Sequence, residues 1–159
     1  MSILTIPQLR RAMALVEKSV LIEYSAAQMF DLVDGVEQYS QFLPWCNRTE
    51  LKFRDDKKTV ATLFIDFHAV KSHFTTSNDK EHPTLMKIAL VDGPFRRLEG
   101  YWRFKPLAEN ACKIEFSLHY EFSSKTFEKI IGPVFARIAG SFIEAFVKRA
   151  QQVHGAPRG

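Results

Sequence analysis

A long amphipathic segment near the C-terminal end limits the folds that this chain can adopt. Between residues 123 and 153, apolar side chains recur every three or four positions, and charged residues fill the positions between them. This spacing predicts one long helix with a single buried face. Ser123 or Ser124 can cap its start, and Gly155 can end it. Pro133 should kink or split it locally. Such a wide, phenylalanine-rich face needs a large concave partner.

Two segments upstream of this helix alternate strictly between apolar and polar residues. One face of the first carries Leu98, Gly100, Trp102 and Phe104, and one face of the second carries Cys112, Ile114, Phe116, Leu118, Tyr120 and Phe122. A period of two predicts antiparallel strands with one buried and one solvated face. Less regular patterns predict further strands at 15–23, 48–54, 59–67, 70–77 and 84–91. Asn78 and Asp79 are expected to begin a turn.

The order of these elements predicts an α+β helix-grip fold, in which a curved seven-stranded antiparallel sheet wraps around the long C-terminal helix. Ser25 is expected to cap the first of two short helices after the first strand, and residues 36–39 form the second. We assign residues 14–154 to a single domain. Residues 1–13 do not fit the pattern and are expected to be a flexible tail, with an ordered extra turn of helix as the alternative.

Charge and cysteine content bound the partners and the compartment. A net charge of +4 and a pI of about 9.1 permit contact with RNA or anionic lipid without requiring it, and nothing in the sequence predicts a DNA partner. Cys46 and Cys112 are expected to be reduced thiols, because no export signal is recognisable. No run of about 18 uncharged apolar residues predicts a membrane span. The expected localisation is cytoplasmic, with peripheral contact at the inner membrane left open.

Residue types that could support catalysis or metal binding do not occur in a recognisable arrangement. The five histidines lack the spacings that metal sites use, and no phosphate-binding or nucleophile motif is present. Cys46 is expected to be a packed loop thiol rather than a reactive one. Tyr120, Ser72 and Thr76 could aim a polar group inward, but an ordinary hydrogen-bonded core residue is the favoured interpretation of each. We therefore predict no catalytic residue, no metal and no required cofactor.

An apolar cavity between the sheet and the long helix is the more specific hypothesis. Its walls are expected to include Phe64 or Phe67, Phe74, Ile88, Trp102, Phe104, Phe116, Leu118, Tyr120, Phe135, Ile138 and Phe142. Its lid is expected to include Phe42, Leu43, Pro44, Trp45, Pro94 and Phe95. A completely filled core remains an equal alternative, because periodicity reports burial and does not report voids.

Several separate motifs resemble the coenzyme Q-binding/RatA family, a branch of the START and polyketide cyclase-like superfamily. They are Tyr39-x-x-Phe42-Leu43-Pro44-Trp45-Cys46, Gly93-Pro94-Phe95-x-x-Leu98-x-Gly100-x-Trp102-x-Phe104-x-Pro106-Leu107, Cys112-x-Ile114-x-Phe116-x-Leu118-x-Tyr120-x-Phe122 and Gly132-Pro133-Val134-Phe135. They lie in the family's order between residues 14 and 150.

The resemblance implies a START/Bet v 1-like helix-grip fold and a non-enzymatic role in binding lipid. Members of the mitochondrial type bind ubiquinone and support respiration, so the first hypothesis is a carrier or chaperone for ubiquinone or another polyprenyl lipid. Bacterial members are also described as toxins that bind the large ribosomal subunit and block subunit association. The second hypothesis is therefore a ribosome-binding regulator that uses outward cations, namely Lys71, Arg96, Arg97, Arg103, Lys105 and Lys113. An oligoketide cyclase-like enzyme is a third alternative, and no legible acid–base pair supports it.

Overall fold

The computed structural model describes residues 13–155 and contains the predicted elements in the predicted order. The strands are β1 (Ala14–Ile22), β2 (Cys46–Arg54), β3 (Lys58–Phe67), β4 (Val70–Glu81), β5 (Leu85–Asp92), β6 (Phe95–Ala108) and β7 (Ala111–Phe122). The helices are α2 (Ala26–Asp34), the 3₁₀ helix η1 (Val36–Gln41), α3 (Lys125–Gly140) and α4 (Phe142–His154). The predicted tail, apart from Met13, lies outside the described residues.

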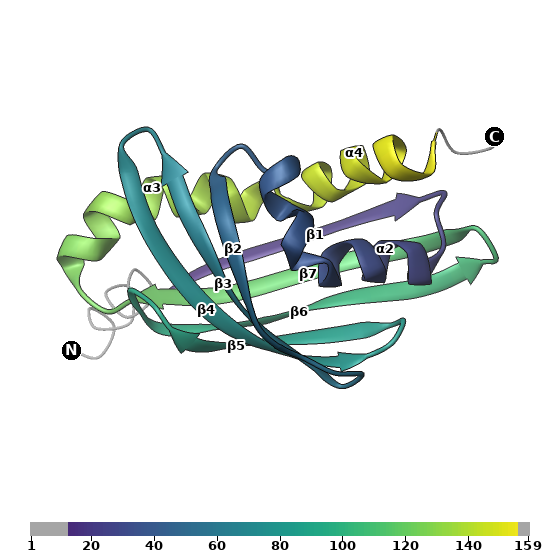
Figure 1. The fold of residues 1–159 in the computed structure, drawn as a ribbon, viewed down its shortest axis with the longest axis horizontal. Helices are drawn as coiled ribbons and strands as arrows, with labels where there is room; N and C mark the ends of the chain where they lie inside the picture. Colours follow the sequence, from purple (N-terminus) through teal and green to yellow (C-terminus); the bar gives the residue numbers. More distant parts are fainter. Residues whose placement is uncertain (1–12, 156–159) are drawn as a thin grey trace, which may run out of the picture.

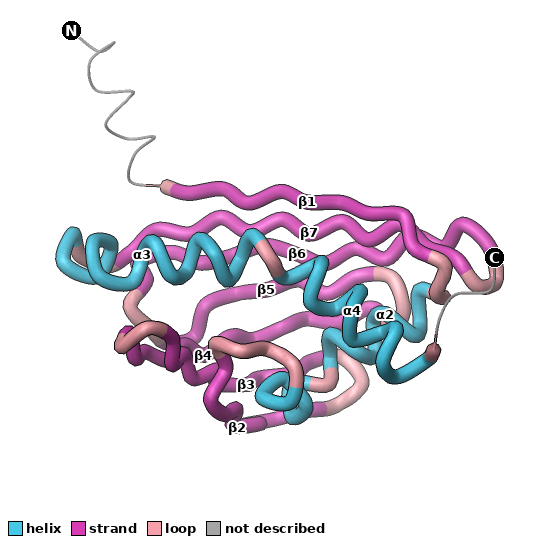
Figure 2. The backbone as a smooth tube through the Cα atoms, turned by 90° about the horizontal axis from the view of Figure 1, so that it is seen from above, coloured by secondary structure: helices cyan, strands magenta, loops and turns pink. Residues whose placement is uncertain are grey.

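The strands form one antiparallel sheet with the order β1-β7-β6-β5-β4-β3-β2. Figure 1 shows that this sheet is strongly curved, and Figure 2 shows α3 and α4 running along its concave face. The alternation predicted for β6 and β7 is confirmed, since Trp102 pairs with Met86 on one side and Phe116 on the other, and all three side chains are buried. The core therefore lies between the sheet and the helices, which confirms the helix-grip fold.

The C-terminal helix is divided, but at a different place from the predicted one. α3 runs through Pro133 without interruption, and the break comes at Ser141, where α3 and α4 meet at an angle of 46°. Pro133 is tolerated because the carbonyl that it leaves without a donor belongs to Lys129, which is exposed to solvent. At the Gly140–Ser141 pair, the Ser141 N–H and hydroxyl both donate to the carbonyl of Ile138 at 3.2 Å, which replaces the regular i to i−4 hydrogen bond.

The fourth strand is longer than its pattern predicted. Asn78 and Asp79 lie within β4, where Asn78 pairs with Thr59 of β3 and Ile88 of β5, so they do not form a turn. Because β4 has a hydrogen-bonded neighbour on each side, pairing overrides the local preference of Asn and Asp for turns. The extension places Asn78 and Lys80 on the inward face of the sheet, in the same alternation as Phe74.

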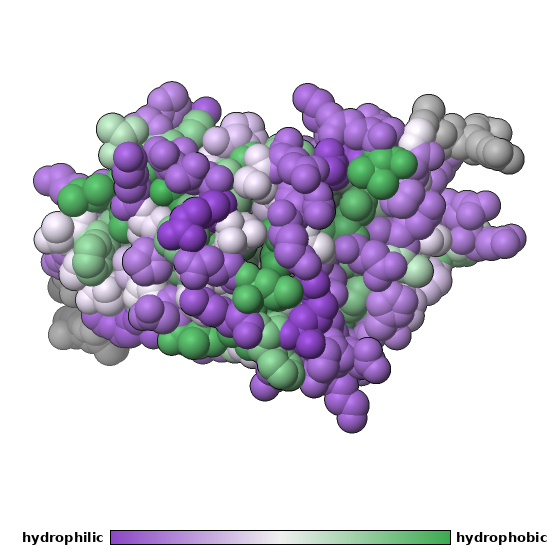
Figure 3. Space-filling view, viewed as in Figure 1, coloured by the Kyte–Doolittle hydropathy of each residue, from purple (hydrophilic) through white to green (hydrophobic). Residues whose placement is uncertain are grey.

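The ends of the helices follow the predicted capping. Ser25 and Gln28 form a capping box at the start of α2, Ser124 accepts from the Phe127 N–H at the start of α3, and Gly155 ends α4. Among the described residues, no single helix is long and apolar enough to cross a membrane, and the bent pair of α3 and α4 meets that test only when both are counted together. The face of the molecule seen in Figure 3 is largely hydrophilic, with apolar residues in separate patches.

Candidate functional site

A small apolar cavity of about 50 Å³ lies between the concave face of the sheet and the helices. Strands β3 to β7, the helix η1 and the facing sides of α3 and α4 all contribute to its wall. The lining residues are Val36, Tyr39, Ala61, Leu63, Phe74, Thr76, Asn78, Ile88, Leu98, Trp102, Phe116, Leu118, Phe135, Phe142 and Phe146. The core around this cavity is thus mostly filled, and the space left can take a few waters.

Seven of the predicted wall residues line this cavity, and they come from the sheet and from both C-terminal helices. These are Phe74, Ile88, Trp102, Phe116, Leu118, Phe135 and Phe142. Trp102 lies against Phe116 with ring centroids 4.5 Å apart, and Phe142 lies 5.6 Å from Phe116. Whether these side chains bind a ligand stays a prediction.

The other predicted wall residues are placed away from the cavity. Phe104 is buried beneath α2, where its ring lies 5.6 Å from that of Phe30. Tyr120 belongs to an aromatic cluster around Phe135 at the α3 end, and Ile138 is buried without lining the cavity. Burial raises the pKa of the Tyr120 phenol, which therefore stays protonated at neutral pH.

The two alternative wall residues at the end of β3, Phe64 and Phe67, lie outside the cavity. Phe67 is half-buried at the end of β3, and the guanidinium of Arg137 lies over its ring at 5.5 Å, while Phe64 faces outward beneath Arg48. Neither of these two phenylalanines lines the cavity.

The predicted lid loop after η1 packs against α4. Leu43 and Trp45 are buried, the Trp45 ring lies 5.7 Å from Phe142, and the half-buried Phe42 lies 5.3 Å from Phe146. Pro44 is the exposed member of the loop. Contact with two cavity-lining residues of α4 places this loop directly behind the cavity wall.

The second predicted lid segment, Pro94 and Phe95, lies near α3 rather than α4. Pro94 is half-buried, and Phe95 is buried in the aromatic cluster, with its ring 4.9 Å from those of Phe122 and Phe135. Gly93 has a φ of 145°, and a Cβ there would lie 2.8 Å from the Cβ of Phe74, so this tight turn requires glycine.

The lining includes three residues with oxygen-containing side chains, Tyr39, Thr76 and Asn78. Of these, only Thr76 was predicted from the sequence as an inward polar residue. Tyr39 donates its hydroxyl proton to the carbonyl of Val33, and burial raises the pKa of its phenol, so it remains neutral. Asn78 was assigned to a turn, although the alternation of β4 would have placed it inward. Ser72, the remaining inward candidate, does not line the cavity.

The two thiols lie in the core. Cys46 and Cys112 are both free and buried, and burial raises the pKa of each thiol to about 11. A thiol with so high a pKa is almost entirely protonated at neutral pH and is a weak nucleophile, which supports the packed interpretation of Cys46. Among residues 13–155, no three His, Cys, Asp or Glu side chains converge as metal ligands would.

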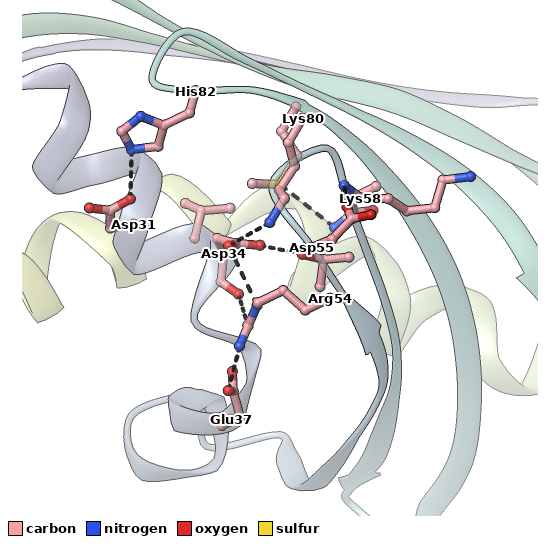
Figure 4. Close-up of polar contacts among 12 residues, drawn as sticks. Asp31, Asp34, Glu37, Arg54, Asp55, Lys58, Lys80 and His82 are labelled. Atoms are coloured by element: carbon pink, nitrogen blue, oxygen red, sulfur yellow. Dashed lines mark hydrogen bonds and ion pairs between the residues drawn. The ribbon is translucent and has the colours of Figure 1, made fainter.

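A network of charged side chains fixes η1, and with it Tyr39, to the sheet (Figure 4). At the end of α2, the Asp34 carboxylate accepts from Thr59 Oγ1 at 2.7 Å and from Lys80 Nζ at 3.1 Å. Arg54 of β2 donates to the Asp34 carbonyl at 2.7 Å and to both oxygens of Glu37 at 2.6 and 2.7 Å. These hydrogen bonds from Arg54 lower the pKa of Glu37. One wall of the cavity is thus held by ionic contacts from β2 and β4.

The outward cations predicted to bind RNA are largely paired with carboxylates on the same face. Arg96 bonds to Glu121 at 2.7 Å and Arg97 to Glu99 at 2.7 Å, while Arg103 and Lys113 both lie within 4 Å of Glu115. Within the described part of the chain, Lys71 and Lys105 form no ion pair. The strand face therefore presents less free positive charge than the sequence suggested.

Comparison with known proteins gives a consistent family assignment. A family model described as polyketide cyclase / dehydrase and lipid transport matches residues 22–147. The chain is 40% identical over 140 residues to a Vibrio cholerae protein named ribosome association toxin RatA, covering 88% of this chain and 97% of that protein. It is 28% identical over 142 residues to the mitochondrial coenzyme Q-binding protein COQ10 homolog B of Xenopus laevis, covering 87% of this chain and 58% of that protein.

Among solved structures, the aromatase/cyclase Zhui from Streptomyces sp. R1128 superposes with a TM-score of 0.75, covering 88% of this chain and 94% of that chain. Its sequence is 15% identical, so this likeness concerns the fold alone.

Proposed function

Since this chain belongs to the polyketide cyclase / dehydrase and lipid transport family, among the relatives of RatA and COQ10, we propose that it binds a ring-bearing lipid of the ubiquinone type in its inner cavity. The lipid is carried as a bound ligand, without a catalytic step. The observation that carries this proposal is the convergence of aromatic side chains from the sheet and both C-terminal helices on the same cavity.

The composition of the lining favours an apolar, planar ligand. Trp102 and Phe116 offer ring faces on the sheet side, and Phe135, Phe142 and Phe146 offer ring edges and faces from the helices. Aromatic rings attract a ligand ring by offset stacking and edge-to-face contact, and they require few polar groups to orient it. The likeness to COQ10 supports a quinone head group as the ring.

Binding of such a ligand requires the cavity to widen. Pockets that hold ligands of this size generally enclose roughly 300–1,000 Å³, whereas this cavity holds about 50 Å³. The break at Ser141 separates Phe135 on α3 from Phe142 on α4, so a change in the angle between these helices moves the two walls apart. We expect the helices to shift outward when the ligand enters, at the cost of their packing on the sheet.

A cavity-filling variant tests this function. Titration with decylubiquinone should quench the fluorescence of wild-type protein saturably, because Trp102 lies in the cavity wall. Ala61→Leu, which adds three carbon atoms to the lining, should weaken binding at least tenfold. Ala136→Leu makes the same change on the exposed side of α3 and should bind as the wild type does.

Two results would contradict the proposal. One is an absence of saturable quenching in the wild type, together with an organic extract of gently purified protein that contains no quinone or polyprenyl lipid by mass spectrometry. The other is equal binding by wild-type protein and a folded Ala61→Leu variant.

Ribosome association is the second candidate function, and the 40% identity to RatA over nearly the whole of that protein favours it. Contacts with RNA phosphates are made by Lys and Arg side chains. A cation that is already paired with a carboxylate must give up that partner first, so unpaired cations are favoured. Among the described residues, Lys125 and Lys129 of α3 are exposed and form no ion pair, unlike Arg96 and Arg97 of β6. We therefore propose α3 as the RNA-facing side, because these two unpaired cations are four residues apart on one helix, whereas Lys71 and Lys105, also unpaired in this part of the chain, lie on separate strands, β4 and β6.

Co-sedimentation with isolated large ribosomal subunits tests this placement. Lys125→Glu with Lys129→Glu should reduce the bound fraction several-fold, and binding by the wild type should fall steeply as salt rises. Arg96→Glu with Arg97→Glu reverses the same number of charges at paired positions and should have a smaller effect. An equal or greater loss from the strand variant would contradict the placement at α3, and no binding by the wild type at low salt would contradict the function.

A further inference from the structure

Asn78 gives the cavity one polar feature that the proposed function does not use. Its side chain lines the cavity from β4, and its Oδ1 atom is buried with no hydrogen-bond partner among the described residues. A buried carbonyl oxygen without a donor is costly, and most such atoms in folded proteins are satisfied. From this geometry we infer that the cavity selects a ligand whose head group carries an O–H donor, such as a hydroquinone, over one that carries only acceptors, such as a quinone. This inference rests on the proposed function.

A neighbouring sulfur atom favours one orientation of the Asn78 amide. Its Nδ2 lies 3.6 Å from the sulfur of Met86, which is fully buried on β5. A thioether sulfur can only accept, so this contact favours the NH₂ group facing the sulfur and the carbonyl in the other position. Exchanging the two amide ends would set an oxygen acceptor against a sulfur acceptor. The free atom is therefore an acceptor, and it calls for a donor.

The remaining polar groups nearby do not supply that donor. Thr76 and Trp102 also line the cavity, but neither the Thr76 hydroxyl nor the Trp102 indole N–H makes a hydrogen bond to Oδ1. Tyr39 already gives its hydroxyl proton to the Val33 carbonyl. Thr62 and Thr75 bond to each other at 2.6 Å and do not line the cavity. Lys80, the next inward residue of β4, donates to Asp34. No described side chain donates to Oδ1, so we expect the donor to come from what occupies the cavity.

The consequence for ligand choice follows from hydrogen-bond chemistry. The hydroxyl of a hydroquinone or of a polyprenyl alcohol can donate to Oδ1, while the carbonyl of a quinone can only accept and would face Oδ1 with like polarity. Sites built to bond a hydroxyl reject analogues that lack it, because the buried partner is then left unpaired. The apolar walls recognise the ring or chain of either form, so Asn78 sets the preference between them.

The test uses the oxidised and reduced forms of one probe, because only the reduced form can donate a hydrogen bond from its ring oxygens. Wild-type protein should bind decylubiquinol about tenfold more tightly than decylubiquinone, measured by anaerobic titration of fluorescence. Asn78→Leu, which replaces the amide by an apolar group of similar size, should bind the two forms within about twofold of each other. A circular dichroism spectrum and a thermal midpoint like those of the wild type show that the variant is folded.

The outcomes separate this inference from the function beneath it. Equal affinities of the wild type for the two probes would overturn the inference alone, because water would then be the donor to Asn78. A quinol preference that survives in Asn78→Leu would also overturn it. No binding of either probe would overturn the proposed function itself. If Asn78→Leu fails to fold, a second pair of probes tests the inference on the wild type alone. The wild type should bind farnesol about tenfold more tightly than farnesyl methyl ether, which lacks the hydroxyl donor. Equal binding of these two probes would refute the donor requirement.

Discussion

Replacing Gly100 with alanine should strongly lower the free energy of unfolding of this protein. A Cβ at Gly100 would lie 2.0 Å from the carbonyl oxygen of Ser117 and 2.9 Å from the Cα of Leu118, both backbone atoms of the neighbouring strand. No rotation relieves a clash between Cβ and backbone, so β6 and β7 must separate and lose hydrogen bonds. We expect a loss of about 4 kcal/mol or more in the free energy of unfolding, which is much of what holds a typical domain folded.

Gly140→Ala is the matched control, because nothing lies within 4 Å of a Cβ at that position at the end of α3. Alanine favours the helix over glycine by about 0.8–1 kcal/mol, so this variant should be as stable as the wild type or slightly more stable. Urea unfolding followed by circular dichroism measures both. An unfolding free energy of Gly100→Ala within 1 kcal/mol of the wild type would show that the two strands can move apart at little cost. Because Leu98 and Trp102 flank Gly100 in the cavity wall, the close approach of the strands also sets the shape of the site.

The fold was predictable because its strongest signals are local. Alternation in β6 and β7 places Trp102 and Phe116 inward whatever their partners are, and the helical repeat does the same for Phe135 and Phe142. Two opposed apolar surfaces of this size leave few arrangements other than a curved sheet around a helix. The family resemblance led to the same fold, and the relatives found by comparison confirm it.

The details that depend on distant partners were not predictable from one sequence. Asn78 has the local character of a turn residue, and only pairing with β3 and β5 keeps it in the strand. The helix bends at Ser141 and not at Pro133, because the exposed position of Lys129 makes the missing hydrogen bond cheap. Arg96 of β6 forms an ion pair with Glu121 of the neighbouring strand β7, and this contact depends on the register between the two strands. The volume of the cavity likewise depends on how side chains interlock, which periodicity does not report.

Replacing Asp34 with alanine should have the second largest effect on stability. The Lys80 ammonium, whose side chain is only 6% exposed, lies 3.1 Å from the Asp34 carboxylate, which is 18% exposed. Removing the carboxylate leaves a buried cation without a counter-charge and also removes the acceptor of the Thr59 hydroxyl. Breaking a buried pair in this way typically costs about 3–5 kcal/mol, and the partial exposure of Asp34 places the expected loss near the lower end.

Asp31→Ala provides the control on the same helix. Asp31 also pairs with a residue near the end of β4, His82, at 2.9 Å, but it is 67% exposed, so its loss should cost about 0.5 kcal/mol or less. The double variant Asp34→Ala with Lys80→Met removes both charges and should regain most of the stability lost by Asp34→Ala alone, because an apolar side chain can replace the buried ammonium. Unfolding free energies of the two single variants and the double variant test this argument. If the double variant were no more stable than Asp34→Ala, the cost would lie in the lost contacts of the carboxylate with Thr59 and with Arg54, whose Nε lies 3.6 Å from it, and not in the stranded Lys80 charge. The anchoring of η1, which carries Tyr39 of the cavity wall, would then depend on Thr59 and Arg54 rather than on Lys80.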